Sequence, residues 1–379
     1  MTGTRRFGGG AIVSAAVSIG APGTRDGGAT DGSPAVVDDR PSAYIPGDRR
    51  RALAAGAALP SRVSGSALFA DISGFTPLTE ALADELGSER ASEVLTGHLN
   101  RVFHAVIAEL DRFGGEVIYF SGDAITCWLD GDDGSRAAAC GLAMQEAMAE
   151  VAHISTPGGK ELELALKIAV VAGRASRFVV GDPEIQLIDV LAGTIVDELA
   201  AAEHLARSGE VVVERSLLES LGGRVATGEL RSEPDGVSVG VLERFLDELP
   251  ATADTVDGTD ELPDELARPW LLPAVYERLS TGRGEFLAEL RPAYPMFVSF
   301  GGIDYDLDES ASEKLDEFVR AAQQVLSSFG GNVLQLTLGD KGAYLYGVFG
   351  TPYAHEDDAA RACAAALALH ALECSTAAR

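Results

Sequence analysis

The chain has 379 residues, 46% of them hydrophobic, and its 58 acidic against 30 basic side chains give a formal net charge of −28. This length is enough for two or three domains that each bury a core. The negative charge opposes non-specific binding to nucleic acid or to anionic lipid, because both are polyanions. We therefore expect no nucleic-acid partner, and an anionic substrate would have to be recruited by metal ions or local basic groups.

The N-terminal segment, residues 1–42, is rich in Gly, Ser, Asp and Thr and lacks hydrophobic periodicity. This composition predicts a disordered extension. Its apolar run at residues 11–21 has the length of a signal-peptide core, but no run in the sequence approaches the roughly 20 residues that span a bilayer. The sequence therefore predicts no membrane span.

The cysteines give a prediction of compartment. They lack the CxxC spacing of a metal site, and two of them lie in alanine-rich helical sequence. We expect all four to be reduced thiols in the core of a cytoplasmic protein. They are Cys127, Cys140, Cys363 and Cys374.

A strand and two helical segments come next. The run SALFADI, residues 66–72, is a short strand, and Thr76 followed by Pro77 is typical of a helix N-cap and first helical position. Apolar residues recur at helical spacing from Val94 to Leu110, which predicts a helix that faces a core. This helix is expected to end at the Gly114–Gly115 pair.

A hairpin follows this helix. The runs EVIYF at 116–120 and AITCWL at 124–129 read as strands joined by Ser-Gly-Asp, so Asp123 is expected at the tip. A helix at about 135–151 and further strands and helices up to about residue 214 complete the pattern. This order predicts an α+β fold with helices on an antiparallel sheet, and a first domain at 62–248.

The segment 249–292 is predicted to be a linker with a short helix. Its first part, up to residue 268, is acidic and contains Pro250 and Pro263. The run PWLLPAVYERLSTG then suggests the helix.

An internal repeat defines a second domain at 293–379. The run FGGEVIYFSGDAITCWL returns about 220 residues later as FGGNVLQLTLGDKGAYLYGVFG, and an alanine-rich helix follows each run. Alignment places Ser299 opposite Asp71 and Asp340 opposite Asp123, with Lys341 next in the chain. Only the first copy therefore keeps both acids.

Asp71 and Asp123 form the candidate site. If their strands are neighbours, the two carboxylates converge and suit Mg2+, which binds carboxylate and carbonyl oxygens together with substrate phosphates. The turn after Asp71 offers N–H groups at a helix N-terminus, where phosphate binds well. Taken singly, each aspartate is better explained as an ordinary turn residue. The turn comprises Ser73, Gly74, Phe75 and Thr76.

Together, FADISGFTPLTE and FGGEVIYFSGDAI resemble the catalytic domain of the class III nucleotidyl cyclases. The tandem arrangement over about 60–379 resembles the soluble, bicarbonate-responsive adenylyl cyclases and their bacterial multidomain relatives. The resemblance implies a ferredoxin-like cyclase fold in two pseudo-repeated domains. It also implies that the two domains pair within the chain, although a homodimer is possible.

The implied activity is conversion of ATP to cyclic AMP and pyrophosphate, by attack of the ribose 3′-hydroxyl on the α-phosphate. Asp71 and Asp123 would hold two Mg2+ or Mn2+ ions with the carbonyl of Ile72, and the turn at 73–76 would cradle the triphosphate. Lys341 would read adenine and so select ATP over GTP. Without the resemblance, Lys341 is most simply an exposed turn lysine.

Two departures from the family pattern qualify this expectation. The sequence ends at Arg379, before the unit that in the family carries a ribose-orienting asparagine and a transition-state arginine, so we expect an incomplete second domain. The alternative function is therefore a degenerate cyclase pair that binds nucleotide or acts as a regulatory module. Tyr119 and Ala200 replace the lysine and arginine of the bicarbonate pocket, so activation by bicarbonate is not expected.

Overall fold

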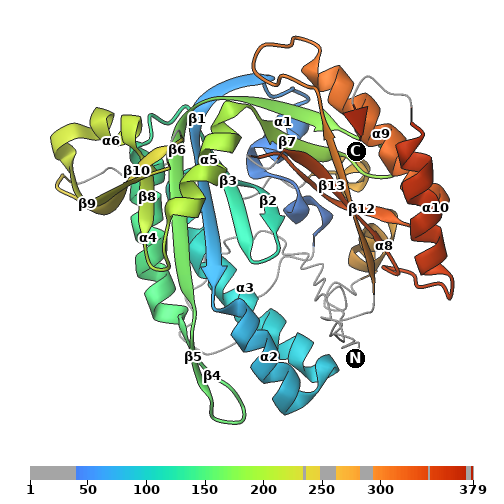
Figure 1. Ribbon diagram of the computed structural model, residues 1–379, viewed down its shortest axis with the longest axis horizontal. Helices are drawn as coiled ribbons and strands as arrows, with labels where there is room; N and C mark the ends of the chain where they lie inside the picture. Colours follow the sequence, from blue (N-terminus) through green and yellow to red (C-terminus); the bar gives the residue numbers. More distant parts are fainter. Residues whose placement is uncertain are drawn as a thin grey trace, which may run out of the picture.

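The computed structural model describes residues 40–233, 236–247, 262–281, 293–339, 342–372 and 377–378. They form two α+β units that lie side by side (Figure 1), so the expected fold class is confirmed. Most of the expected disordered extension, residues 1–39, lies outside the described residues. So does most of the expected acidic linker. The domain boundaries stay predictions.

The first unit is built on an eight-stranded sheet. Its order is β2-β3-β1-β6-β8-β10-β9, with β7 paired to β6. The central strand β1 is antiparallel to both of its neighbours, β3 and β6, whereas β6 and β8 are parallel. The strands are β1 (Arg62–Ser73), β2 (Glu116–Ser121), β3 (Ala124–Asp130), β6 (Ala165–Val180), β7 (Ile188–Ala192), β8 (Val211–Glu214), β9 (Val225–Ser232) and β10 (Ser238–Phe245).

Helices cover both faces of this sheet because its strands alternate apolar side chains between two cores. Leu68 and Ala70 of β1 enter the larger core with α3 and α4, and Ala67 enters the smaller core with α5. The helices are α2 (Phe75–Leu86), α3 (Ser88–Arg112), α4 (Ser135–Val151), α5 (Thr194–Leu205) and α6 (Arg215–Leu221). Smaller elements are β4 (His153–Ser155), β5 (Glu161–Glu163) and η2 (Gly222–Arg224).

The second unit repeats the first at the level of topology. Its order β12-β13-β11-β14 matches β2-β3-β1-β6, and all of these pairs are antiparallel in both sheets. The repeat seen in the sequence is therefore a repeat of strand order. The elements are β11 (Tyr294–Gly301), α9 (Ala311–Ser328), β12 (Asn332–Thr337), β13 (Ala343–Phe349), α10 (Asp358–His370) and β14 (Ala377–Ala378).

The two units share packing. Phe178 and Val180 at the end of β6, and Val190 of β7, belong to the core formed by α9 and the second sheet. Between the units, Ser176 Oγ donates a hydrogen bond to the Tyr305 carbonyl at 2.8 Å. The long β6–β7 hairpin thus joins the first sheet to the second unit.

An N-terminal segment that the sequence did not predict packs against the first unit. It comprises η1 (Pro41–Tyr44) and α1 (Gly47–Ala54), and Ser42 is buried. Ile45 shares a small core with Trp270 and Leu271 from the region of α7 (Asp264–Ala267), η3 (Arg268–Trp270) and α8 (Pro273–Ser280). The short helix expected near residue 275 is therefore present.

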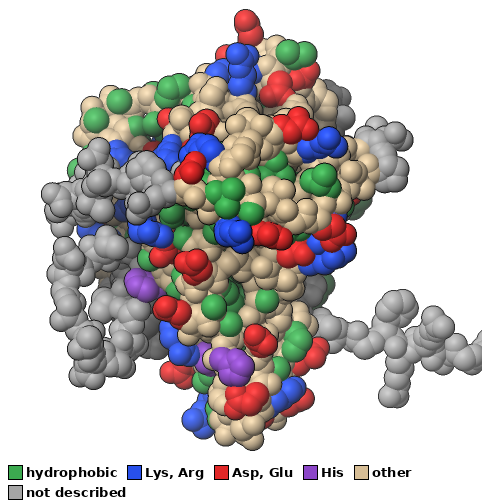
Figure 2. Space-filling view, turned by 90° about the vertical axis from the view of Figure 1, so that its left-hand side faces the viewer, with side chains coloured by type: hydrophobic (Ala, Val, Ile, Leu, Met, Phe, Trp, Pro, Cys, Tyr) green, Lys and Arg blue, Asp and Glu red, His purple; other side chains and the backbone are tan. Residues whose placement is uncertain are grey.

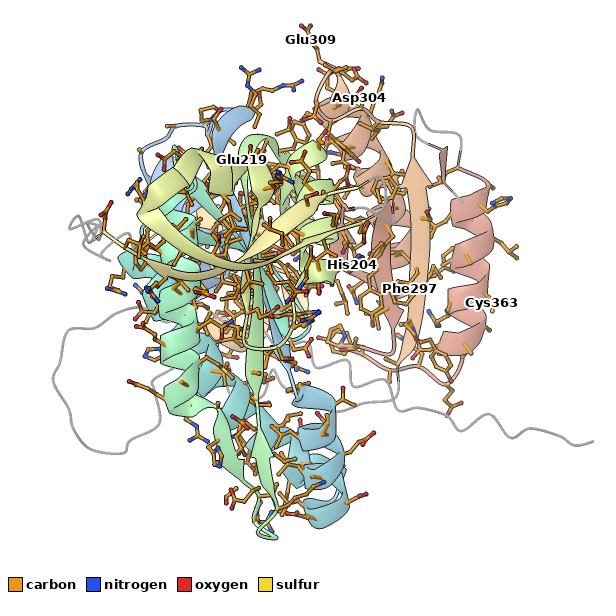
Figure 3. All side chains as sticks on the ribbon, turned by 60° about the vertical axis from the view of Figure 1, so that its left-hand side comes forward. His204, Glu219, Phe297, Asp304, Glu309 and Cys363 are labelled. Carbon is orange, nitrogen blue, oxygen red and sulfur yellow. The ribbon has the colours of Figure 1, made fainter. Side chains whose placement is uncertain are left out.

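Two details differ from the sequence-based expectations. Helix α2 begins at Phe75 after Gly74, not after Thr76, because Gly74 adopts the left-handed backbone at φ 94° that turns the chain. Cys127 and Cys140 are buried as expected, but Cys363 on α10 is exposed (Figure 3), and Cys374 lies outside the described residues. Cys363 is exposed because α10 buries only one narrow stripe.

The surface is mixed in character. Figure 2 shows acidic and basic side chains interspersed over one face, with single apolar groups between them. Among the described residues, no helix combines the length and apolar character that crossing a membrane requires.

Candidate metal and nucleotide site

The two candidate carboxylates are on neighbouring strands. Asp71 in β1 is paired with Ala124, the first residue of β3, which directly follows Asp123. The Ile72 N–H donates a hydrogen bond to the Asp123 carbonyl at 3.1 Å. The β1–β3 register thus brings Asp71, Ile72 and Asp123 together at one end of the sheet.

The two carboxylates also influence each other electrostatically. Burial raises the pKa of Asp123, the negative charge of Asp71 raises it further, and the positive charge of Lys167 partly opposes both effects. Asp123 lies in the tight turn of the β2–β3 hairpin after Gly122, whose φ is 69°. A cation bound between the carboxylates would relieve their repulsion.

Lys167 is the site residue that the sequence reasoning missed. It is the partner of Asp71 in the β1–β6 ladder, and its Nζ lies 3.1 Å from Asp71 Oδ2. The same Nζ also contacts a carboxylate oxygen of Glu203 on α5. The immediate partner of the Asp71 charge in the fold is therefore a lysine.

The environment of Lys167 keeps it charged. Burial acts to lower its pKa, but its hydrogen bonds and charge interactions with Glu203 and Asp71 outweigh burial and raise it. The signal in the sequence was a single charge inside the apolar run LALKIAVV. By strand alternation, that charge lies on the α5 face of the sheet, as Asp71 does.

The turn after β1 requires glycine. A Cβ on Gly74 would lie 2.7 Å from the Glu163 carbonyl oxygen, and its φ of 94° strains any other residue. Ser73 Oγ is already engaged, since it donates to the Ala165 carbonyl at 3.1 Å and lies 2.8 Å from Ser208 Oγ. Ser73 thus fixes the turn through its side chain.

Phe75 and Thr76 form the first turn of α2. Phe75 packs partly against the larger core, and Thr76 is exposed. Gly74 is the N-cap residue of α2 and has no side chain that could bond the first N–H groups of the helix. N–H groups at such a helix start favour an anion. Phosphate binding by the turn at 73–76 stays a prediction.

The donor set suits a hard cation. Within the described ranges, no cluster of three or more His, Cys, Asp or Glu side chains could hold a metal. Two carboxylates and a backbone carbonyl are an incomplete set of oxygen ligands, which fits Mg2+ or Mn2+ when substrate phosphates and water complete the coordination.

The second copy contributes no carboxylate at the matching strand position. Ser299 of β11 is paired with Tyr344 of β13, as Asp71 is paired with Ala124. Asp340 and Lys341 lie outside the described residues, so base reading by Lys341 stays a prediction. Before them, a Cβ on Gly339 would lie 3.8 Å from the Ala200 Cβ on α5. The β12–β13 hairpin therefore reaches the helix that carries Glu203.

The two repeats are in contact at the hairpins. Gln335 Nε2 of β12 donates to Ser121 Oγ of β2 at 2.9 Å. Burial raises the pKa of Tyr119, and Tyr344 of β13 is close enough to add to this shift. His204 of α5 and Phe297 of β11 lie on the facing sides of the two units (Figure 3). Tyr119 and Ala200, which stand at the bicarbonate-pocket positions of the resembling family, therefore each lie close to the second unit.

The chain is similar in sequence to known proteins. No family model matches it. Human adenylate cyclase type 10 is 24% identical over 338 residues, which cover 82% of this chain and 20% of the human protein. The enzyme of the same name from Oryctolagus cuniculus is 24% identical over 314 residues, which cover 76% of this chain and 19% of that protein. The chain thus spans about a fifth of the length of the curated relatives that it matches.

Solved structures give partial matches. The guanylyl cyclase Cya2 is 25% identical with a TM-score of 0.39, covering 48% of this chain and 92% of that one. The adenylyl cyclase CyaB from P. aeruginosa is 20% identical with a TM-score of 0.40, and the match covers 50% of this chain and 98% of that one.

The similarity to adenylate cyclase type 10 extends over most of the chain and so includes both repeats. It agrees with the two motifs that meet here, the glycine turn after Asp71 and the hairpin that carries Asp123. The chain is therefore a homologue of adenylate cyclase type 10 over most of its length.

Proposed function

We propose that this chain is an adenylyl cyclase, which converts ATP to cyclic AMP and pyrophosphate. The observation that carries the proposal is the pairing of Asp71 with the Asp123 turn, next to the glycine turn that begins α2. Burial and the negative charge of Asp71 raise the pKa of Asp123. Two neighbouring carboxylates at the start of a helix are costly unless they bind cations.

Each residue has a separate role in this proposal. Asp71, Asp123 and the Ile72 carbonyl hold two Mg2+ or Mn2+ ions, while the turn at 73–76 orients the triphosphate through its N–H groups. When bound, the ions activate the ribose 3′-hydroxyl and neutralise charge at the α-phosphate. Lys167 adds a fixed positive charge, which helps a chain of net charge −28 to accept a polyanion.

The second unit supplies the other wall of the site. The contacts of Gln335 with Ser121 and of Gly339 with Ala200 support pairing of the two repeats within one chain. Lys341, two residues beyond Gly339, then reads adenine N1 and selects ATP over GTP. A homodimer of first repeats would bring no Lys341 to the site. The buried free thiols of Cys127 and Cys140 support a cytoplasmic protein.

The test is formation of cyclic nucleotide by the full chain with Mn2+ or Mg2+, measured by mass spectrometry with ATP and with GTP. We expect cyclic AMP from the unmodified protein, and loss of activity in Asp71→Asn and Asp123→Asn. Asp84→Asn, which changes an exposed carboxylate on α2, is the matched control and should keep full activity. A chain that binds ATP but forms no cyclic AMP with either metal would contradict the proposal and favour a regulatory nucleotide-binding module.

A further inference from the structure

We propose that Lys167 is a built-in competitor for the metal ion at Asp71, and that Glu203 is the anchor that retains the lysine when metal displaces it. The proposal rests on the proposed function in one respect, that Asp71 is a metal ligand. It adds a regulation of that site, because a cation can bind Asp71 only when Lys167 leaves Asp71 and stays paired with Glu203.

Lys167 of β6 forms an ion-pair bridge between Asp71 of β1 and Glu203 of α5. Asp71 and Lys167 are direct partners in the β1–β6 ladder, and the ammonium is 3.1 Å from Asp71 Oδ2. The same ammonium contacts Glu203, which α5 brings to this face of the sheet. Lys167 thus lies between the carboxylate of the site and a carboxylate outside it.

This bridge is partly shielded from solvent. The side chains of Lys167, Asp71 and Glu203 are 25%, 23% and 15% exposed. Fully exposed ion pairs contribute little, because water replaces either partner at low cost. Here each carboxylate loses part of its hydration, so the choice between ammonium and metal ion has a measurable effect on binding.

The charges explain why Lys167 needs a second carboxylate partner besides Asp71. Lys167 and a divalent ion both seek the Asp71 carboxylate, and two cations at that distance repel each other. If Asp71 were its only partner, Lys167 would lose all compensation when metal arrives. Glu203 offers a second carboxylate already in contact, so the ammonium can leave Asp71 and stay paired. Glu203 is therefore a positioning residue, which acts on the metal through Lys167.

The experiment measures Mn2+ binding to the full chain without nucleotide, by electron paramagnetic resonance or calorimetry. Lys167→Met removes the competitor, and we expect Mn2+ to bind about 3- to 10-fold more tightly. Lys167→Arg keeps the charge and should leave the affinity at or below that of the unmodified protein. Because Lys167→Arg preserves the ion pairs, it also serves as the variant least prone to misfold.

A matched control exists in the second unit. Lys314 contacts Asp308 at 2.6 Å, and their side chains are 35% and 23% exposed, close to the values for Lys167 and Asp71. Lys314→Met should leave Mn2+ affinity unchanged. A similar gain in Lys314→Met would mean that loss of any positive charge has the effect, and would overturn the proposal.

The role of Glu203 is tested by a double-mutant cycle. Glu203→Gln leaves Asp71 as the only carboxylate partner of Lys167, so we expect Mn2+ to bind about 2- to 5-fold more weakly. This loss should disappear when Lys167→Met is already present. If it persists at full size, Glu203 acts on the metal through its own charge, and its assignment as the anchor of Lys167 is wrong.

The outcomes separate this proposal from the proposed function. Mn2+ binding that is abolished by Asp71→Asn but unchanged by Lys167→Met would show that Lys167 does not compete with the metal, and would leave the metal site itself supported. Mn2+ binding that is insensitive to Asp71→Asn would overturn the metal site and the competitor together. Tighter binding in Lys167→Met supports the competitor whether or not the chain forms cyclic AMP.

Discussion

Arg49 of α1 and Asp189 of β7 form a buried ion pair, with 2.8 Å between Arg49 Nε and Asp189 Oδ2 and side-chain exposures of 7% and 2%. Arg177 of β6 bonds the same carboxylate and also contacts Asp48. This network joins the N-terminal helix to the strands that connect the two units.

We predict that Asp189→Asn destabilises the fold by about 3–5 kcal/mol, because two buried guanidinium groups lose their shared carboxylate. Thermal or urea unfolding of the full chain measures the loss. The control is Arg215→Met, which breaks a pair with Glu219 whose side chains are 58% and 66% exposed. It should cost less than about 1 kcal/mol. Equal losses in both variants would show that the buried network does not stabilise the fold.

Gly74→Ala is predicted to impair both stability and function. The added Cβ would lie 2.7 Å from the Glu163 carbonyl oxygen at a φ of 94°, so the turn must shift at a cost of about 1–3 kcal/mol. Because this turn precedes α2, we expect weaker ATP binding, measured as a raised KM for cyclic AMP formation.

Gly56→Ala is the control for this change. Gly56 also has a positive φ of 63°, but a Cβ there meets nothing within 4 Å. It should cost only the backbone strain, about 1 kcal/mol, and leave KM unchanged. A raised KM in Gly56→Ala as well would mean that the effect is not local to the phosphate turn.

Glu198→Gln is predicted to stabilise the protein at neutral pH. Burial raises the pKa of Glu198, and the negative charges of Glu214, Asp197 and Asp306 raise it further. Since the folded-state pKa exceeds the unfolded value, the folded chain gains stability from protonation at low pH and loses it as pH rises through the folded pKa. The variant removes this loss, so its Tm should exceed that of the unmodified protein by about 1–2 °C at pH 7.

The pH dependence distinguishes this effect from a change in packing. The gain in Glu198→Gln should shrink as pH falls and disappear below 4.5, the ordinary pKa of a glutamate, where the natural carboxyl is protonated in both states. A gain that stays constant from pH 4 to pH 8 would show that charge is not its cause.

The local features of the site could be predicted because they depend on short stretches. Gly74 and the Ser-Gly-Asp hairpin are turn signals that need no distant partner, and they place Asp71 and Asp123 at strand ends. Lys167 and Glu203 could not be assigned, because their meeting with Asp71 depends on the β1–β6 register and on the docking of α5. Neither is written in a local pattern.

The N-terminal helix α1 was missed for a related reason. The sequence GDRRRALA has little apolar character, and its order depends on long-range contacts. These are the Arg49–Asp189 pair and the hydrogen bond from the Gly47 N–H to Glu116 Oε2 at 2.8 Å. A helix held by buried charge pairs has no hydrophobic periodicity to reveal it.

A buried glutamine of α9 joins the second unit to the β6–β7 connection of the first. Gln323 of α9 is 1% exposed; its Oε1 accepts from the Asp182 N–H and its Nε2 donates to the Gln186 carbonyl, both at 2.7 Å. Gln323→Leu removes the partner of two partly buried backbone groups of the first unit, at a cost of about 1–3 kcal/mol in total.

If the second unit completes the active site, Gln323→Leu lowers cyclic AMP formation while Mn2+ binding that depends on Asp71 persists, because Gln323 lies outside the carboxylate pair. The neighbouring Gln324 is the control, because it is exposed and its Nε2 donates to Asp182 Oδ2 at 3.1 Å. Gln324→Leu should leave stability and turnover nearly unchanged. Full activity in a destabilised Gln323→Leu protein would show that turnover does not depend on this joint, and would favour assembly of the site from two chains.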